Sequence, residues 1–397
     1  MKKNIIIISL TLCFMFSGQY YLFAETAAKP RLGIWITAFS PEKVMYSKEN
    51  ADTLIRTCTK CGINDIYLQL YRADKAYYDS GLTDRTSYDA AFSEARSDTV
   101  TYLIKTAEKN DIRVHAWVNL LCIAQNREAN ILKKFGDGVL TTDQYGRTSM
   151  QKDQKDTLDN YYIRENQLFL DPGDGRVRAY LAGIVQEIVS RYPELSGVHL
   201  DYVRYPAVVP FVPGARFTSH GISYGYNAAN LKNFRSATGL DAAKMPQSRG
   251  NFLLWDKWRR DQVTSLVKEV SQTARAVSPA IKISCAIVPS VERTYLTTFQ
   301  DWTAWLKEGY VNYVVAMNYT DDTKLMELNT RSLMTEGFKE KIQIGVGAYL
   351  LKDSPKTLED QISLLRGIPV SGIVIFSYDD IAANKNLQDF LIDNSGN

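Results

Sequence analysis

This chain of 397 residues has few histidines, a small net charge and no nucleotide-binding motif. The three histidines form no H-x-H or H-E-x-x-H pattern, and no carboxylate cluster has ligand spacing, so no metal site is expected. The formal net charge of +3 gives no strong case for binding nucleic acid or an acidic membrane surface. A phosphate-binding loop and a dinucleotide fingerprint are also absent, so we expect no cofactor.

Long hydrophobic runs are confined to the N-terminus. The basic segment Met1–Lys3 precedes the apolar run Ile5–Phe16, and Ala24 stands where a signal peptidase would cut. Residues 1–24 therefore have the layout of a secretory signal peptide. No later segment approaches the ~18–20 apolar residues that span a bilayer. We expect an exported protein, periplasmic or extracellular, that is not membrane-bound after signal cleavage.

Cysteine is rare, with five residues in the whole chain. One pair, Cys58-x-x-Cys61, has the spacing of a redox site. However, the pair continues the apolar stripe of Leu54 and Ile55 at helical spacing, and it lies at the C-terminal end of that helix. A redox pair would lie at a helix N-terminus, which stabilises the thiolate. We therefore predict that these cysteines belong to the core.

The chain does have a regular alternation of short apolar runs and helical patterns. Helix starts are recognisable, for example at Ser354-Pro355 and at Asp174. Repeated strand–helix units force a parallel sheet, and eight of them close into a barrel. We predict an α/β protein with a single (β/α)8 TIM barrel over residues 30–395. Its strands are expected at Leu32–Ala38, Asp65–Leu70, Arg113–Leu120, Gly197–Tyr202, Lys282–Val288, Tyr313–Met317, Ile342–Gly347 and Gly372–Ser377.

Two connections are much longer than the others. Leu121–Asp174 follows the third strand and has little periodicity, and Pro206–Asn251 follows the fourth and is rich in Pro, Gly, Ser and Tyr. Long connections in a compact domain are usually functional loops. We expect both to rise from the C-terminal rim of the barrel, where they would wall a groove.

The predicted strands alternate aliphatic with polar or aromatic side chains. Because alternate residues face opposite sides, the aliphatic set would meet the helices and the other set would converge inside the barrel. A barrel interior built for stability alone favours Val, Ile and Leu, so this one predicts a site. We interpret His115 and His199 as hydrogen-bonding residues of a lower layer. The inward set in the first three strands is Trp35, Thr37, Tyr67, Gln69, Tyr71, His115, Trp117 and Asn119.

Asp201 is the best-placed catalytic candidate. It ends the apolar strand in Gly197–Pro206, and ligands of parallel α/β folds bind at the carboxyl ends of the strands. Glycosidic bonds are usually cleaved by two carboxyl groups, one acid and one base or nucleophile. We expect Asp201 to be the nucleophile or base. The structural alternative is an ion pair with Arg204.

The second carboxyl group is less well defined by the sequence. Asp321 and Asp322 follow the sixth strand, and Asp321 is the favoured acid. Glu292 lies beyond the fifth strand, and Asp379 and Asp380 follow the eighth. The alternative for each of them is a solvated loop charge, which is the commoner role of acidic residues in loops. The residues expected to bind or stack on the substrate are Trp35, Gln69, Arg72, Trp117, Asn119, Arg204, Tyr205, Tyr319 and Tyr378.

Four segments resemble the glycosyl-hydrolase-like 10 family of exported bacterial barrels. They are Leu170–Gly173 (LDPG), Gly197–Pro206 (GVHLDYVRYP), Trp258–Val263 (WRRDQV) and Gln300–Thr320 (QDWTAWLKEGYVNYVVAMNYT). The resemblance runs from Arg31 to about Asp380. It implies hydrolysis of a polysaccharide outside the cytoplasm, with Asp201 as the catalytic residue, and some members act on peptidoglycan glycan strands that lack stem peptides.

A second resemblance, to the chitinase motif D-G-x-D-x-D-x-E-Y-P, is incomplete. Met317-Asn318-Tyr319 also looks like the sixth-strand M-x-Y of those enzymes. However, Val203 stands where the proton-donating glutamate would be, and His199 replaces one aspartate. The acid must therefore come from another strand.

The sequence as a whole predicts an exported glycoside hydrolase that acts on a polymeric glycan, with peptidoglycan glycan strands as one candidate. A non-catalytic glycan-binding barrel is the first alternative, because the second carboxyl group is ambiguous. A glycan deacetylase or esterase is the second alternative, but it would need a metal cluster or a Ser–His pair. The sequence leaves the sugar, the linkage and the oligomeric state open.

Overall fold

The computed structural model describes residues 30–150, 162–210 and 222–395. The predicted signal peptide at residues 1–24 lies outside these ranges. Within them, no helix is both long enough and apolar enough to cross a membrane.

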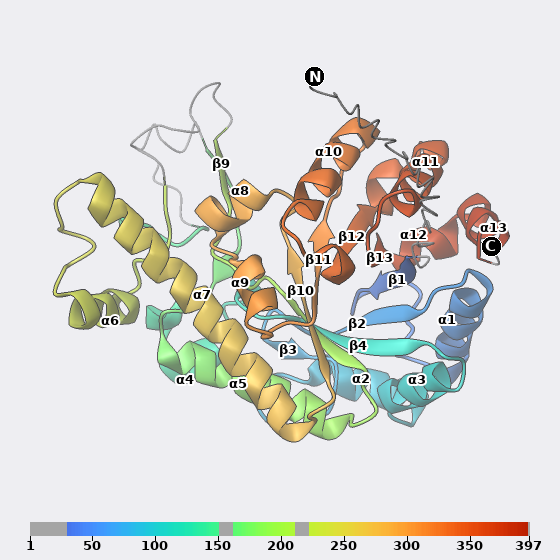
Figure 1. Ribbon diagram of the computed structural model, residues 1–397. Helices are drawn as coiled ribbons and strands as arrows, with labels where there is room; N and C mark the ends of the chain where they lie inside the picture. The colour runs from blue at the N-terminus through green and yellow to red at the C-terminus, as the bar shows by residue number, and fades with distance from the viewer. Residues whose placement is uncertain (1–29, 151–161, 211–221, 396–397) are drawn as a thin grey trace, which may run out of the picture.

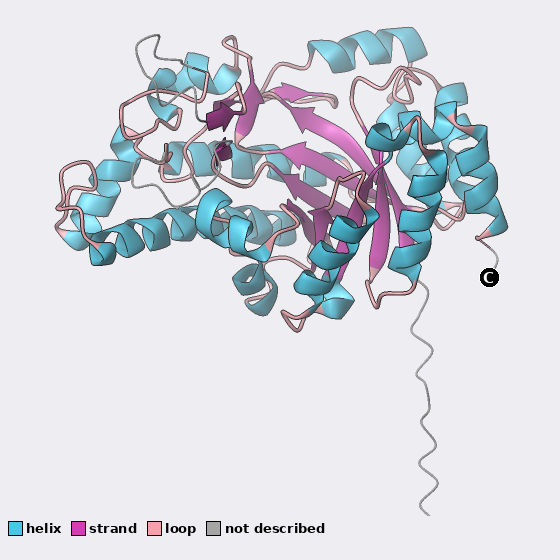
Figure 2. Ribbon diagram, turned by 90° about the horizontal axis from the view of Figure 1, so that it is seen from above, coloured by secondary structure: helices cyan, strands magenta, loops and turns pink. Residues whose placement is uncertain are grey.

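Eight parallel strands form a closed barrel, with helices around it (Figures 1 and 2). Around the barrel the order is β1, β2, β4, β8, β10, β11, β12 and β13, and pairing of β1 with β13 closes it. This confirms the predicted fold and all eight predicted strands. Their bounds are β1 Arg31–Ile36, β2 Asp65–Arg72, β4 Arg113–Asn119, β8 Gly197–Asp201, β10 Lys282–Ile287, β11 Tyr313–Met317, β12 Ile342–Gly347 and β13 Gly372–Phe376.

Helices follow the barrel strands and cover their outer faces (Figure 2). The predicted cap at Asp174 is present, because its side chain accepts a hydrogen bond from the backbone N–H of Arg176. Pro355 occupies the first turn of α11, as Ser354-Pro355 predicts. The helices are α1 Lys48–Lys60, α2 Thr86–Ala95, α3 Thr99–Glu108, α4 Asn130–Phe135, α5 Gly175–Arg191, α6 Ala228–Thr238, α7 Arg249–Val277, α8 Val291–Arg293, α9 Trp302–Lys307, α10 Thr323–Met334, α11 Pro355–Arg366, α12 Tyr378–Ala383 and α13 Lys385–Asp393.

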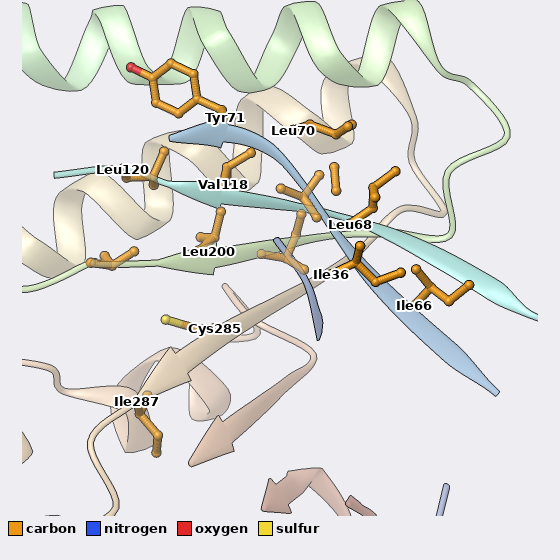
Figure 3. Packing of buried hydrophobic residues seen from close by; sticks show 14 of the residues in the cluster. Ile36, Ile66, Leu68, Leu70, Tyr71, Val118, Leu120, Leu200, Cys285 and Ile287 are labelled. Carbon is orange, nitrogen blue, oxygen red and sulfur yellow. The ribbon is translucent and has the colours of Figure 1, made fainter. Parts of the chain in front are cut away.

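The main hydrophobic core lies between the barrel and its helices. The aliphatic set of strand residues faces outward into it, including Ile36, Leu68, Val118 and Leu200 (Figure 3). Because side chains alternate along a strand, the polar and aromatic set is turned inward. This is the arrangement that the sequence pattern predicts, except at Tyr71. The prediction that Tyr71 faces inward is wrong, because the register of β2 shifts after Gln69 and Tyr71 joins Leu70 in the outer core (Figure 3).

The cysteine prediction is confirmed. Cys58 is buried on the inner face of α1, and Cys61 caps the C-terminal end of that helix. Burial raises the pKa of the Cys58 thiol far above its ordinary value and that of Cys61 to about 11. Both thiols are therefore uncharged and lack the reactive thiolate of a redox pair.

The two long connections contain short elements of their own. The first holds β5 (Cys122–Ala124), α4, β6 (Tyr162–Arg164) and β7 (Leu168–Phe169), and the second holds β9 (Val208–Pro210) and α6. Strand β6 pairs antiparallel with β9, so the two connections are joined to each other beyond the carboxyl ends of the barrel strands. The sequence predicts long rim loops at these places, but it gives no sign of this pairing. A further short strand, β3 (Lys75–Ala76), pairs with the end of β2.

The amino end of the barrel is closed by a buried ion cluster around Asp65. Its carboxylate accepts hydrogen bonds from Nε of Arg31 at 3.0 Å and Nε of Arg113 at 2.7 Å, and it contacts Nε2 of His115 at 2.9 Å. In the same lower part of the barrel, Nδ1 of His199 lies 2.9 Å from Oγ of Ser284. Both histidines are therefore hydrogen-bonding residues of the lower layer, as predicted.

Candidate active site

A cavity of about 290 Å³ opens at the carboxyl end of the barrel. Residues from seven of the eight barrel strands or the segments that follow them contribute to its wall. Ligands of (β/α)8 barrels bind at this end. The lining residues are Trp35, Thr37, Phe39, Gln69, Arg72, Trp117, Asn119, Asp201, Tyr202, Arg204, Ala286, Met317, Tyr319 and Phe376.

Asp201 presents its carboxyl group to this cavity from the last position of β8. The backbone turns at Tyr202, whose φ is 51°, in the left-handed region, so the strand ends there. Asp201 is 6% exposed and accepts hydrogen bonds from Nε1 of Trp117 at 3.0 Å and from the backbone N–H of Tyr202 at 2.7 Å. Burial nevertheless raises the pKa of this carboxyl above its ordinary value. Asp201 therefore keeps a proton to higher pH than an exposed aspartate does.

A pair of amides lies beside Asp201. Asn119 is at the same level as Asp201 on the neighbouring strand. Its Oδ1 accepts a hydrogen bond from Nε2 of Gln69 at 3.2 Å, and Oε1 of Gln69 accepts one from the backbone N–H of Ala38 at 3.1 Å. These bonds fix both amide groups. Within the described residues Nδ2 of Asn119 has no partner, so it can donate to a ligand.

Aromatic rings make up much of the remaining wall. The ring of Tyr319 stacks on that of Phe376 with centroids 5.7 Å apart, and Trp117 and Trp35 meet Phe376 edge-on at 6.2 and 6.1 Å. Gly345 makes room for them, because a Cβ there would lie 2.9 Å from Cη2 of Trp35 and 3.2 Å from Cε1 of Tyr319. Such a wall suits the apolar faces of sugar rings.

Arg204 lines the cavity but is not the direct partner of Asp201. Its guanidinium pairs with Glu165, with Nη1–Oε1 and Nη2–Oε2 distances of 2.5 and 3.1 Å. Arg72 lies on another part of the wall, with its guanidinium 4.8 Å from the ring centre of Phe39. Glu165 was missed from the sequence, because it lies in an aperiodic connection and no motif marks it.

The predicted second carboxyl groups after the fifth and sixth strands do not reach the cavity wall. Asp322 caps α10 and accepts hydrogen bonds from the backbone N–H groups of Lys324 and Leu325. Asp321 and Glu292 are exposed and are absent from the lining. The hypothesis that Asp321 faces Asp201 across the mouth therefore gains no support from the geometry. The segments after these strands lead the chain to the start of the next helix, so Asp322 caps α10 and Glu292 lies in the first turn of α8.

The acidic pair after the eighth strand is also engaged elsewhere. Oδ1 of Asp379 accepts a hydrogen bond from Oγ of Ser40 at 2.5 Å. Asp380 forms a capping box with Ser377 at the start of α12. Among the described residues that line the cavity, Asp201 is the one carboxylic acid.

Two predicted substrate-binding tyrosines lie outside the cavity. Tyr205 is buried, and its hydroxyl donates to Oδ1 of Asp171 at 3.3 Å. Tyr378 is buried in the outer core because β13 ends at Phe376 and the helix turns the next residues away from the barrel. The inward residue of β13 is Phe376, which follows inward-facing Val374 by two positions. The alternation of side chains along a strand identifies Phe376 as an inward residue, but Phe376 was not among the residues predicted from the sequence. Phe39, Tyr202 and Met317 were likewise missed.

The other predicted substrate-binding residues do come together at the cavity. They are Trp35, Gln69, Arg72, Trp117, Asn119, Arg204 and Tyr319. Among the described residues no group of three or more His, Cys, Asp or Glu side chains gathers as a metal site would require.

A closed (β/α)8 barrel with a buried carboxyl, fixed amides and an aromatic wall at its carboxyl end defines a glycoside-hydrolase-like barrel. The comparison with protein families agrees. Residues 31–350 match the family model described as "Glycosyl hydrolase-like 10", and the chain belongs to this family.

Two curated relatives carry hydrolase names. The chain is 24% identical over 384 residues to glycosyl hydrolase YngK of Bacillus subtilis, covering 86% of this chain and 65% of the relative. It therefore spans just under two thirds of YngK. It is 23% identical over 409 residues to glycosyl hydrolase DigH of Escherichia coli K12, covering 89% of this chain and 84% of the relative.

Solved structures share the fold at low identity. The glycoside hydrolase domain of PgaB (BpsB) from Bordetella bronchiseptica superposes with a TM-score of 0.66 at 10% identity, over 91% of this chain and 98% of that domain. The catalytic domain of β-amylase from Paenibacillus polymyxa gives 0.56 at 11% identity, over 94% of this chain and 100% of that domain. At such identities the likeness concerns the fold alone.

Proposed function

We propose that this protein is an exported glycoside hydrolase that cleaves O-glycosidic bonds in a polymeric glycan. The observation that carries the proposal is Asp201, a buried carboxyl group that faces an aromatic-walled cavity at the carboxyl end of the barrel. The basic and apolar N-terminal segment supports export. Peptidoglycan glycan strands without stem peptides are the first substrate to test, because the family resemblance points to them.

Asp201 is the proton donor in this proposal. Breaking a glycosidic bond requires a proton on the departing oxygen, and a carboxyl with a raised pKa keeps its proton to higher pH than an exposed aspartate does. Burial raises the pKa of Asp201, which favours this role over the nucleophile or base expected from the sequence. Trp117 orients the carboxyl through its indole N–H.

The remaining lining residues hold the sugar. Asn119 and Gln69 supply hydrogen-bonding groups beside Asp201, and Trp35, Tyr319 and Phe376 supply ring faces. Arg72 adds a positive charge at the wall. A site built in this way binds a neutral or anionic sugar in preference to a cationic one.

The test is mass spectrometry of products released from peptide-free peptidoglycan glycan by the mature protein, in parallel with Asp201→Asn. The proposal expects oligosaccharides from the wild type and none from the variant. Intact chains that lose acetyl groups would instead indicate a deacetylase. Equal release by both proteins would remove Asp201 from the mechanism.

A non-catalytic glycan-binding barrel is the second candidate. It is favoured by the finding that Asp201 is the one carboxylic acid among the described lining residues. A binding protein would retain the polymer in a pull-down while releasing no product. Asp201→Asn would then retain it equally well.

A further inference from the structure

Glu165 occupies the point where the two long rim connections meet. Arg164, the last residue of β6, pairs with Val208, the first residue of β9. Glu165 and Ala207 therefore lie next to each other just beyond this ribbon, and the backbone N–H of Ala207 donates to Oε1 of Glu165 at 2.6 Å. The pairing of β6 with β9 thus fixes the position of the Glu165 carboxylate.

Glu165 in turn holds Arg204 at the cavity wall. Both Nη atoms of Arg204 bond to the two carboxylate oxygens, which is the bidentate geometry that orients a guanidinium. The Arg204 side chain is 11% exposed, and its guanidinium lies 4.9 Å from the ring centre of Tyr202 and 5.6 Å from that of Phe169. The arginine is therefore clamped between two rings and one carboxylate.

Arg204 and Glu165 are also the charged residues that act on the Asp201 carboxyl group. The other ionisable groups that act on it are Tyr202, Tyr319, Cys122 and Cys285. Burial raises the pKa of all four, that of Cys122 to about 12, so all are uncharged near neutral pH.

This leaves Arg204, which lines the same cavity as Asp201, and its partner Glu165 as the charged groups that act on Asp201. After burial and its hydrogen bonds, Arg204 lowers the pKa of Asp201 and Glu165 raises it. Arg72 is a further charged residue of the cavity wall. Because Glu165 is paired with Arg204, it both fixes the position of that cation and cancels part of its effect on Asp201.

We propose that Glu165 is a positioning residue that, through Arg204, sets the charge state of Asp201. The catalytic consequence rests on the proposed function, in which Asp201 donates a proton. The effect of Glu165 and Arg204 on the charge of Asp201 does not rest on the proposed function, because it is a property of the protein without substrate. Nothing in this step requires Glu165 to touch the substrate.

The experiment follows the indole N–H signal of Trp117, which bonds to Asp201, as a function of pH in 15N-labelled protein. Trp117→Phe identifies the signal among those of the six tryptophans. Asp201→Asn shows how the Trp117 signal depends on pH when the Asp201 carboxyl group is absent. Glu165→Gln should move the midpoint to lower pH, because the Arg204 charge is no longer compensated. Arg204→Met should move it to higher pH, because the cation is gone and Glu165 remains.

Glu187→Gln is the matched control. Glu187 also accepts three hydrogen bonds, from the Tyr78 hydroxyl, Oγ of Ser80 and the backbone N–H of Gly81, but it lies away from the cavity. Its loss should leave the Trp117 midpoint unchanged. A midpoint that does not fall in Glu165→Gln relative to the control, or one that does not rise in Arg204→Met, would overturn the inference.

Turnover separates this inference from the proposed function. If the wild type releases oligosaccharides, the alkaline limb of its pH profile should move to lower pH in Glu165→Gln and to higher pH in Arg204→Met. Turnover with an unmoved limb overturns the positioning role and leaves the hydrolase intact. Midpoint shifts without any turnover support the electrostatic role and count against the hydrolase. If Glu165→Gln does not fold, Glu165→Met takes its place, with the same expected shift to lower pH.

Discussion

Two buried aspartates at opposite ends of the same barrel have opposite electrostatics. Asp65 is 1% exposed at the amino end, and Asp201 is 6% exposed at the carboxyl end. Burial opposes ionisation of Asp65, but hydrogen bonds and charge from His115 and Arg113 outweigh it and hold its pKa well below the ordinary value. At Asp201 burial prevails over two N–H donors, and the pKa rises.

The difference shows how one residue type serves stability at one end and chemistry at the other. Asp65 contacts Arg31, Arg113 and His115, and these contacts hold its pKa well below the ordinary range of an aspartate. Asp201 has no cation in direct contact among the described residues, and its surroundings are rings and a cavity. A raised pKa suits a carboxyl group that has to donate a proton, whereas a carboxyl group held ionised by ion pairs cannot act as that donor.

Asp201→Asn gives the largest expected effect. Loss of the proton donor should lower product release roughly 10²–10⁴-fold, which is the usual contribution of general acid catalysis. Oligosaccharide release per mole of folded protein measures it. Asp65→Asn is the matched variant and should keep its activity per folded molecule. Similar losses in the two variants would erase the distinction between the two ends.

Asp65→Asn should instead have the larger effect on stability. Removing one partner of a buried ion cluster leaves its cations uncompensated, which typically costs about 3–5 kcal/mol. Arg31 and Arg113 are 41% and 40% exposed and can turn to solvent, so the lower end, about 3 kcal/mol, is expected. Urea denaturation at neutral pH measures it. A cost below that of Asp201→Asn would contradict the structural role of Asp65.

The two aspartates should also give opposite pH dependences of stability. A lowered folded pKa stabilises above the unfolded value of about 3.9, and this stabilisation is lost as pH falls through the folded value. The advantage of the wild type over Asp65→Asn should therefore shrink below about pH 4. A raised folded pKa stabilises below the unfolded value and loses that contribution as pH rises through the folded value.

The wild type should consequently lose stability relative to Asp201→Asn as pH rises above about 4. Free energies of unfolding between about pH 3 and about pH 8 give both difference curves. Parallel curves would contradict the assignment of opposite pKa shifts.

The sequence was sufficient to predict the barrel and the place of Asp201 at the carboxyl end of its strand, but not the contacts that the long connections make near Asp201. Strand periodicity located the eight strands and turned Trp35, Trp117 and Asn119 inward, because alternation is a local property. Contacts such as that of Glu165 with Arg204 depend on the pairing of two distant connections, which no local pattern records. Asp321 does not reach the cavity because the chain leaves the rim after Tyr319 and enters α10, whose cap is Asp322, and the sequence does not specify the path of this segment.

The smallest expected effect extends the comparison from aspartates to tyrosines. Tyr67 belongs to the lower layer, where its hydroxyl donates to Oε1 of Gln343 at 3.0 Å, whereas Tyr319 stacks on Phe376 in the cavity wall. Tyr67→Phe should lower the free energy of unfolding by about 1 kcal/mol and leave KM unchanged. Tyr319→Leu removes a ring face from the cavity, worth about 1 kcal/mol, so KM should rise about fivefold with little loss of stability. Urea denaturation and initial rates on the same glycan measure both quantities. A KM change in Tyr67→Phe as large as that in Tyr319→Leu would show that the lower layer also contacts the substrate, and the functional division between the two ends of the barrel would fail.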